Sequence, residues 1–251
     1  MKSKKSLGQN FFINKNLCNQ IAQIIVKENP DVIVEIGPGT GIFTSSIREI
    51  YKKDMILIEK DDFLAKKLQM FMPDLKILNM DFLDWDFTEL EKYKNSKILF
   101  WGSLPYNVSK PIIKKIISSK YFISTSYFII QKEVAEKYIS KEPNNNLLAV
   151  QTSIYASAKR LFDISSDSFS PRPKVNSSFI SFTPKNKIPE NLKGEEFSSF
   201  LQNSFKQPRK TIRNNLHNIT FQEESIIEEL LNKRPQHLSL DDYSLLFSKV
   251  I

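Results

Sequence analysis

The chain has 251 residues, of which 41% are hydrophobic and 25% charged, and its formal net charge is +8. These values are typical of a globular protein with one large domain and an appendage, or with two modest domains. The single cysteine, Cys18, excludes a disulfide within the chain and a cysteine-cluster metal site. The two histidines, His217 and His237, are too far apart in sequence to indicate a metal site, so no bound metal is expected.

The excess positive charge is concentrated in two stretches, residues 1–15 and 206–213, and neither contains an acidic residue. The cations of the second stretch are Lys206, Arg209, Lys210 and Arg213. Such clusters favour a polyanionic partner, nucleic acid before membrane. A lysine-rich proteome would explain the same charge, so this pattern alone leaves both explanations open. Because the sequence shows neither a signal-peptide core nor an apolar run long enough to span a bilayer, it predicts a cytoplasmic protein.

Short apolar runs alternate with amphipathic stretches over most of the chain. A first helix is predicted over 16–26, with Asn16 as its N-cap. Buried strands are then predicted over 32–36, 55–58, 76–78, 98–100, 127–130 and 175–182, and helices over 43–51, 63–71, 111–118, 131–139 and 147–156. Strand–helix alternation of this kind predicts an α/β fold, a parallel sheet with helices on both faces.

A domain boundary is predicted where Pro184, Pro189 and Gly194 interrupt a polar segment. Beyond it only helical spacing recurs, over 196–205, 211–216, 223–231 and 241–247. We therefore predict two domains, an α/β domain over residues 1–184 and a small all-helical domain over 185–251.

The loop E-I-G-P-G-T-G places Gly37, Gly39 and Gly41 where a predicted strand meets a helix. Glycines there let the backbone approach a ligand closely. A dinucleotide fingerprint would need its third glycine at position 42, which is Ile42, and Pro38 lacks a backbone donor for a pyrophosphate. The loop therefore favours a nucleoside cofactor without phosphates and disfavours a dehydrogenase, although a plain tight turn remains an alternative.

Acidic residues follow the next two predicted strands. Glu59 stands where a carboxylate can bind both ribose hydroxyls. Asp81 can accept a hydrogen bond from an adenine amine, with Phe82 packing nearby. Each acid alone would be read as a solvated loop charge, but with the glycine loop they form a set suited to a nucleoside.

The loop S-L-P-Y, residues 103–106, leaves the end of another predicted strand, where α/β enzymes keep their chemistry. The Ser103 hydroxyl, the backbone stiffened by Pro105 and the aromatic face of Tyr106 suit an amine on a flat heterocycle. A Pro-Tyr turn without any function is the alternative interpretation of this motif taken alone.

Together these motifs resemble the small-subunit ribosomal RNA adenine dimethyltransferases, the family whose loss gives kasugamycin resistance in bacteria. The resemblance runs nearly end to end and in the order of the family. Its stretches are S-L-G-Q-N-F (6–11), E-I-G-P-G-T-G (35–41), L-P-Y-N (104–107), Q-K-E-V-A (131–135), residues 169–177 and residues 205–214.

The resemblance implies a Rossmann-like, S-adenosylmethionine-dependent methyltransferase domain. Its substrate would be the N6 amines of two adjacent adenines in a hairpin loop near the 3′ end of small-subunit (16S) ribosomal RNA. The partner would be the immature 30S subunit, met by a monomeric enzyme that acts in ribosome biogenesis. The helical domain would then dock on RNA through the four cations of residues 206–213.

The resemblance also assigns roles to residues. Cofactor contacts would come from the following set: Asn10, the backbone of Phe12, Gly37, Gly39, Glu59, Asp81, Phe82 and Ser103. Ser103 and Leu104, in the loop stiffened by Pro105, would bind the target amine, and the adenine would be sandwiched by two rings, Tyr106 and Phe169. The chain departs from the family at Ser103, where the family has Asn, and at Pro208, where it usually has Arg.

Two other functions fit the same motifs. The related methyltransferases that confer macrolide resistance modify large-subunit RNA with a similar catalytic domain. A ribosome-assembly factor that keeps the fold but has lost catalysis is also compatible with Ser103. The stretches at 205–214 and 234–239 favour the small-subunit enzyme.

Overall fold

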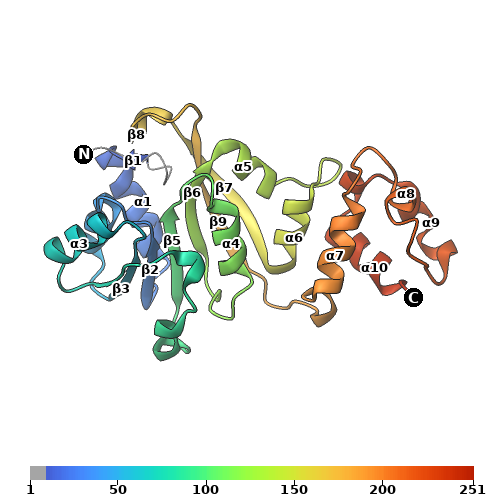
Figure 1. The fold of residues 1–251 in the computed structure, drawn as a ribbon, viewed down its shortest axis with the longest axis horizontal. Coiled ribbons are helices and arrows are strands. Elements are labelled where there is room, and N and C mark those ends of the chain that lie inside the picture. The colour runs from blue at the N-terminus through green and yellow to red at the C-terminus, as the bar shows by residue number, and fades with distance from the viewer. Residues whose placement is uncertain (1–9) are drawn as a thin grey trace. The chain divides into compact units, whose positions relative to one another are not determined.

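The computed structural model describes residues 10–251, and its contacts divide the chain into two compact units (Figure 1). The first unit consists of Met1–Ala135 and Lys159–Pro184, and the second of Glu136–Ala158 and Lys185–Ile251. The predicted boundary after Pro184 coincides with one crossing between the units, but the segment 136–158 packs with the second unit. The lysines at positions 2, 4 and 5 and the first four residues of the S-L-G-Q-N-F stretch lie outside the described residues.

The first unit is built on a seven-stranded sheet with the strand order β4-β3-β2-β5-β6-β9-β7. The strands are β2 (Val32–Ile36), β3 (Asp54–Ile58), β4 (Lys76–Leu78), β5 (Ile98–Ser103), β6 (Ser126–Gln131), β7 (Ala156–Ile164) and β9 (Ser177–Pro184). From β4 to β6 all neighbours are parallel, and β9 pairs antiparallel with β6. The predicted α/β fold is thus confirmed, with a sheet that is mostly rather than wholly parallel because β9 is antiparallel to β6.

Both faces of this sheet are buried, as expected for parallel strands. Successive side chains of a strand point to opposite faces. Ile33, Met55, Leu99 and Ile129 therefore share one face, in a single apolar cluster with side chains of α1 and α2. The opposite face carries Phe100, whose ring lies 6.1 Å from that of Phe87.

The helices of the first unit connect successive strands. They are α1 (Lys15–Lys27), α2 (Ile42–Ile50), α3 (Asp62–Phe71), α4 (Ser109–Ile117) and the start of α5 (Lys132–Tyr138), which continues into the second unit, with 3₁₀ turns η2 (Phe82–Asp84), η3 (Thr88–Tyr93) and η4 (Ser166–Ser168). The predicted N-cap of the first helix, Asn16, is wrong: the side chain of Asn14 accepts the N–H of Leu17 at 3.2 Å, so the helix begins two residues earlier. Asparagine is a preferred N-cap residue at either position, so only the backbone conformation shows that Asn14 rather than Asn16 is the cap.

A second, two-stranded sheet joins the start of the described chain to a distant segment. In it β1 (Phe11–Phe12) pairs antiparallel with β8 (Phe169–Ser170). The N–H of Ile13 extends the pairing by donating to the carbonyl of Ser168 at 2.8 Å. This pairing places the predicted cofactor residues at 10–12 beside Phe169.

The second unit is mostly helical. It contains α6 (Leu147–Tyr155), α7 (Glu195–Ser204), α8 (Ile212–Asn215), α9 (Glu224–Asn232) and α10 (Leu240–Ser248), with 3₁₀ turns η5 (Glu190–Leu192) and η6 (Pro235–His237). Its core includes Phe197, Leu201 and Tyr243 from the C-terminal helices, together with Val150 and Ile154 of α6. This shared core explains why the segment 136–158 belongs to the second unit. Between residues 10 and 251, no helix is long and apolar enough to cross a bilayer.

Candidate active site

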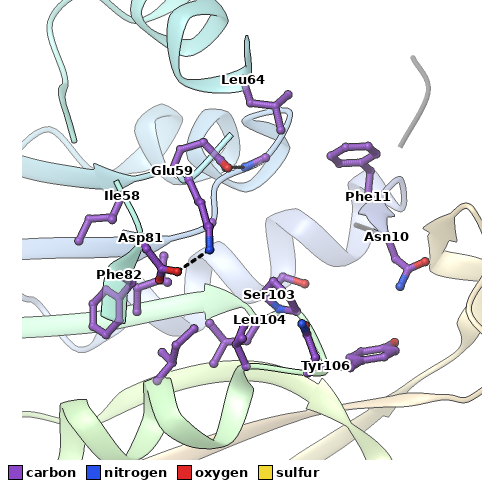
Figure 2. Close-up of a pocket in the computed structure, with 18 of the residues that line it drawn as sticks. Asn10, Phe11, Ile58, Glu59, Leu64, Asp81, Phe82, Ser103, Leu104 and Tyr106 are labelled. Atoms are coloured by element: carbon purple, nitrogen blue, oxygen red, sulfur yellow. Dashed lines mark hydrogen bonds and ion pairs between the residues drawn. The ribbon is translucent and has the colours of Figure 1, made fainter. Parts of the chain in front are cut away.

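A pocket of the first unit opens where β2, β3, β4 and β5 end, the edge at which open α/β sheets bind ligands. Every residue of this unit that the sequence assigns to the site lines the pocket, with the exception of Phe12. These residues are Asn10, Gly37, Gly39, Glu59, Asp81, Phe82, Ser103, Leu104, Pro105, Tyr106 and Phe169. Figure 2 shows Glu59 and Asp81 on one side of the pocket, with Ser103, Leu104 and Tyr106 approaching from the β5 loop and Asn10 and Phe11 from the start of the chain.

The glycine loop between β2 and α2 forms one wall. Gly37, with φ of 65°, has the left-handed backbone that favours glycine, and a Cβ there would meet no atom within 4 Å. Its N–H donates to the carbonyl of Ile58 at 2.9 Å, which fixes the start of the loop against the end of β3. The open space beside Gly37 leaves its backbone accessible to a ligand in the pocket.

Glu59, which follows β3, is held by the backbone of both neighbouring loops. Its Oε2 accepts the N–H of Gly39 and its Oε1 the N–H of Asp61, each at 2.9 Å. The side chain is buried, and this desolvation raises the pKa of the Glu59 carboxyl even though the two N–H donors lower it. A carboxylate oxygen has more than one lone pair, so each oxygen can still accept a ligand hydroxyl.

Asp81, which follows β4, is held differently. Its Oδ1 caps η2 by accepting the N–H of Leu83 at 2.9 Å, and its Oδ2 pairs with Lys60 Nζ at 2.6 Å (Figure 2). Partial burial raises the pKa of the Asp81 carboxyl, but Lys60 and the N–H of Leu83 outweigh it and hold the pKa below the ordinary value. Lys60 is not among the residues predicted from sequence, because a lysine beside an acid gives no sign of pairing with a second acid 21 positions away.

Another buried acid lies beneath the glycine loop, outside the pocket lining. Glu35 of β2 is 2% exposed and accepts the hydroxyl of Thr44 of α2 at 2.7 Å. Burial raises the pKa of the Glu35 carboxyl to about 7, against the lowering effect of Thr44. Glu35 is not among the residues predicted from sequence, although an acid within an apolar strand next to a glycine loop is a signal that could have identified it.

The S-L-P-Y loop is attached to the sheet at both ends. Ser103 is the last residue of β5, and the N–H of Leu104 donates to the carbonyl of Ile129 in β6 at 3.0 Å. Just before it, a Cβ on Gly102 would lie 2.6 Å from the carbonyl oxygen of Ile36, so only glycine lets β5 approach the end of β2 this closely. Beyond the loop, the hydroxyl of Tyr106 lies 3.0 Å from Oγ of Ser177.

Of the two neighbouring phenylalanines at the start of the described chain, Phe11 lines the pocket and Phe12 does not. The Phe12 side chain is buried in the core, with its ring 4.7 Å from Phe43 and 5.0 Å from Phe169. Phe11, which the sequence analysis did not assign, lines the pocket. In a strand, neighbouring side chains point in opposite directions, so only one of the two rings can face the pocket. A contact from the Phe12 backbone to a cofactor stays a prediction.

The four predicted RNA-binding cations lie in the second unit, in the turn after α7 and in α8. Lys206, Arg209 and Lys210 are exposed, and none has an ion-pair partner within residues 10–251. Arg213 pairs with Glu224 at 3.0 Å. The turn is held by Asn215, whose side chain accepts the N–H of Gln207 at 2.7 Å and donates to its carbonyl at 3.0 Å.

No cluster of three or more metal-ligating side chains occurs in the part of the chain that the structure describes. The titratable groups of the pocket are carboxylates, one lysine and one phenol, with no histidine among them. The carboxylates and the aromatic wall suit a nucleoside ligand.

The chain is similar to known proteins over nearly its whole length. The family model described as ribosomal RNA adenine dimethylase matches residues 1–246. A relative from Pelagibacter ubique, named ribosomal RNA small subunit methyltransferase A, is 36% identical over 257 residues, covering 97% of this chain and 95% of its own.

Two solved structures share the fold. A dimethyladenosine transferase from Plasmodium falciparum has a TM-score of 0.77 at 20% identity, covering 94% of this chain and 95% of its own. The 23S rRNA methyltransferase ErmE has a TM-score of 0.75 at 19% identity, covering 95% of this chain and 98% of its own. Because these two scores are close, the fold alone does not favour one of these two proteins over the other as a guide to the substrate of this chain.

Proposed function

The chain belongs to the ribosomal RNA adenine dimethylase family, and from this we propose that it dimethylates the N6 amines of two adjacent adenines near the 3′ end of small-subunit ribosomal RNA. It is a methyltransferase that uses S-adenosylmethionine. The observation that carries the proposal is that Glu59, Asp81 and the S-L-P-Y loop line the same pocket. A nucleoside donor and a flat acceptor base need these groups side by side.

The residues of the pocket fit S-adenosylmethionine, which is a nucleoside without phosphates. Glu59 would bind the ribose hydroxyls, Asp81 would accept from the adenine amine beside Phe82, and the open backbone at Gly37 would border the methionine part. A phosphate-bearing cofactor would instead meet two carboxylates and a proline in the loop. When bound, S-adenosylmethionine supplies a methyl group already activated on a sulfonium.

For the target base, the chain supplies positioning. Tyr106 and Phe169 would stack on the adenine, and aromatic stacking is worth roughly 1–3 kcal/mol per base taken out of its stack. The Ser103 hydroxyl and the carbonyl of Leu104 would accept the hydrogens of the amine. This draws the nitrogen lone pair out of conjugation with the ring and orients it for in-line attack, so no histidine base is needed.

The relative's name and the basic stretch support the small-subunit particle as substrate. Lys206, Arg209 and Lys210, with Arg213, would bind RNA phosphates of the immature 30S subunit. We further propose that the enzyme acts as a monomer in the cytoplasm, where subunits are assembled.

Methylation of isolated particles tests the proposal. Purified protein with labelled S-adenosylmethionine should label undermethylated 30S subunits at two adjacent adenines and leave 50S subunits unlabelled. Exclusive labelling of 50S would make it a large-subunit enzyme. Cofactor binding by calorimetry without transfer to either particle would favour an assembly factor that has lost catalysis.

A further inference from the structure

The hydroxyl of Tyr106 has a partner on a strand 71 positions further along the chain. It lies 3.0 Å from Oγ of Ser177, the first residue of β9. Ser177 is fully buried, whereas Tyr106 is half-buried and lines the pocket. The phenol therefore reaches from a loop into the edge of the sheet, while its ring remains beside the pocket.

The backbone fixes Ser177 firmly. Ser177 stands opposite Gln131 in the antiparallel pairing of β9 with β6. Beside this pair, the N–H of Lys132 donates to the carbonyl of Asn176 at 3.0 Å. The Cα of Ser177 therefore has a set position and its buried hydroxyl can turn about only one side-chain bond, whereas a tyrosine ring on a loop can turn about two.

The second aromatic wall, Phe169, is supported by Asn176, the residue before Ser177. The Asn176 side chain accepts the N–H of Ser166 at 3.1 Å, at the foot of the short segment that leads to Phe169. Phe169 is then held from the other side by its pairing with Phe12. Ser177 thus contacts the Tyr106 hydroxyl, and Asn176 contacts the segment that carries Phe169.

From these contacts we infer that Ser177 is a positioning residue: its hydroxyl holds the Tyr106 ring at the separation from Phe169 that a flat base requires. The inference rests on the proposed function, because it assigns Tyr106 to the acceptor base. Ser177 itself lies outside the pocket lining and would touch neither cofactor nor RNA. Its effect should therefore be confined to steps in which the base is held.

A double-mutant cycle tests this inference, with the single-turnover rate of methyl transfer to 30S subunits as the readout. Ser177→Ala and Tyr106→Phe should each lower the rate about fivefold, the order of one neutral hydrogen bond. The double variant should also be about fivefold slower rather than about 25-fold slower, because both changes remove the same contact. The affinity for S-adenosylmethionine, measured by calorimetry, should stay at the wild-type value in all three.

Ser178→Ala is the matched control. Ser178 is the next residue of β9, is equally buried, and donates to Asp163 Oδ1 at 2.7 Å, away from Tyr106. Both serine variants should lose thermal stability, but only Ser177→Ala should lose rate.

Several results would overturn the inference: equal rates for the two serine variants, multiplying effects in the double variant, or a wild-type rate for Tyr106→Phe. Tyr106→Phe keeps the ring, so its result stands even if Ser177→Ala does not fold. An inactive wild type would instead remove the proposed function and is recognised before any variant is compared.

Discussion

The pocket of the first unit and the basic stretch of the second hold their charged groups in opposite ways. In the pocket, Glu59 is 6% exposed, and both of its oxygens accept backbone N–H groups. In the basic stretch, Lys206, Arg209 and Lys210 are exposed and, within residues 10–251, lack an ion-pair partner. The difference matches the two tasks that we propose for these regions, since a small cofactor must be placed to a fraction of an ångström, whereas RNA phosphates need mainly positive charge.

This comparison implies that the two regions respond to different perturbations. Changes in the pocket should act on cofactor affinity with little dependence on salt, because the groups are buried and short-range. Changes in the basic stretch should act on RNA affinity and should depend steeply on salt. Four variants, taken in order of expected effect, can sharpen or break the distinction.

The largest effect is expected from Glu59→Ala. The substitution removes the proposed ribose acceptor and leaves the N–H groups of Gly39 and Asp61 without their partner, so S-adenosylmethionine should bind about 100-fold more weakly. Calorimetry at low and at high salt would measure this. Glu49→Ala, the same change at an exposed position of α2, is the control and should bind normally. Unchanged affinity in Glu59→Ala would contradict the assignment.

The second effect concerns pH and Glu35. Burial raises the pKa of this carboxyl from 4.5 to about 7, so the folded protein keeps a proton that the unfolded chain loses. The stability this provides is complete below pH 4.5 and is lost as the pH rises through 7. Glu35→Gln should therefore gain about 2 kcal/mol in unfolding free energy, relative to wild type, between pH 5 and pH 8. Denaturant titration measures it, with Glu49→Gln as control, and a constant difference would argue against the raised pKa.

The third effect is a change in how steeply RNA affinity falls with salt concentration, rather than in the affinity at one salt concentration. Replacing Lys206, Arg209 and Lys210 together by Gln should lower the dependence of log affinity on log salt by about 2, since each phosphate contact contributes about 0.7 to 0.9. Adding Arg213→Gln should change the slope less, because Arg213 is paired with Glu224.

The control for these cations is another triple variant, with Gln at Lys27, Lys52 and Lys94. These lysines are exposed and lie in the connections that lead into β2, β3 and β5, at the amino ends of the strands. Their replacement should leave the slope as it is. An unchanged slope in the Lys206, Arg209 and Lys210 variant would mean that these cations form an ordinary solvated surface and do not bind RNA phosphates.

The smallest effect is expected at Ser103, where the family has Asn. The serine hydroxyl can accept the same hydrogen bond but has a shorter reach, and hydrogen bonds weaken quickly with distance and angle. Ser103→Asn should raise the rate of transfer by about threefold, a fraction of one hydrogen bond, with unchanged cofactor affinity. A wild type that transfers nothing until Asn is introduced would show that the natural chain is not an enzyme.

The parts of the fold that follow from periodicity were predictable, and those that follow from long-range pairing were not. β2 is apolar apart from Glu35, so the sequence predicts both its extent and its burial. β7 was missed because it is an edge strand with charged, half-exposed residues and continues directly from α6.

The same division applies to the site. The residues of the glycine loop, Glu59 and Asp81 were predictable because the ends of parallel strands meet at one edge of the sheet. The pairing of Lys60 with Asp81 and the contact of Ser177 with Tyr106 depend on side-chain directions at distant positions. One sequence alone carries no signal for such pairs.

The pairing of β1 with β8 has a consequence for how the protein becomes active. It joins segments at opposite ends of the first unit's chain: the Asn14 side chain donates to Ser168 Oγ across 154 positions. Contacts of such large sequence separation carry a large loop-closure entropy, so long-range strand pairing is slow to form. The wall that carries Phe169 should therefore be among the last parts of the pocket to form. During synthesis, the nascent chain would be unable to hold a target base until most of its length has left the ribosome.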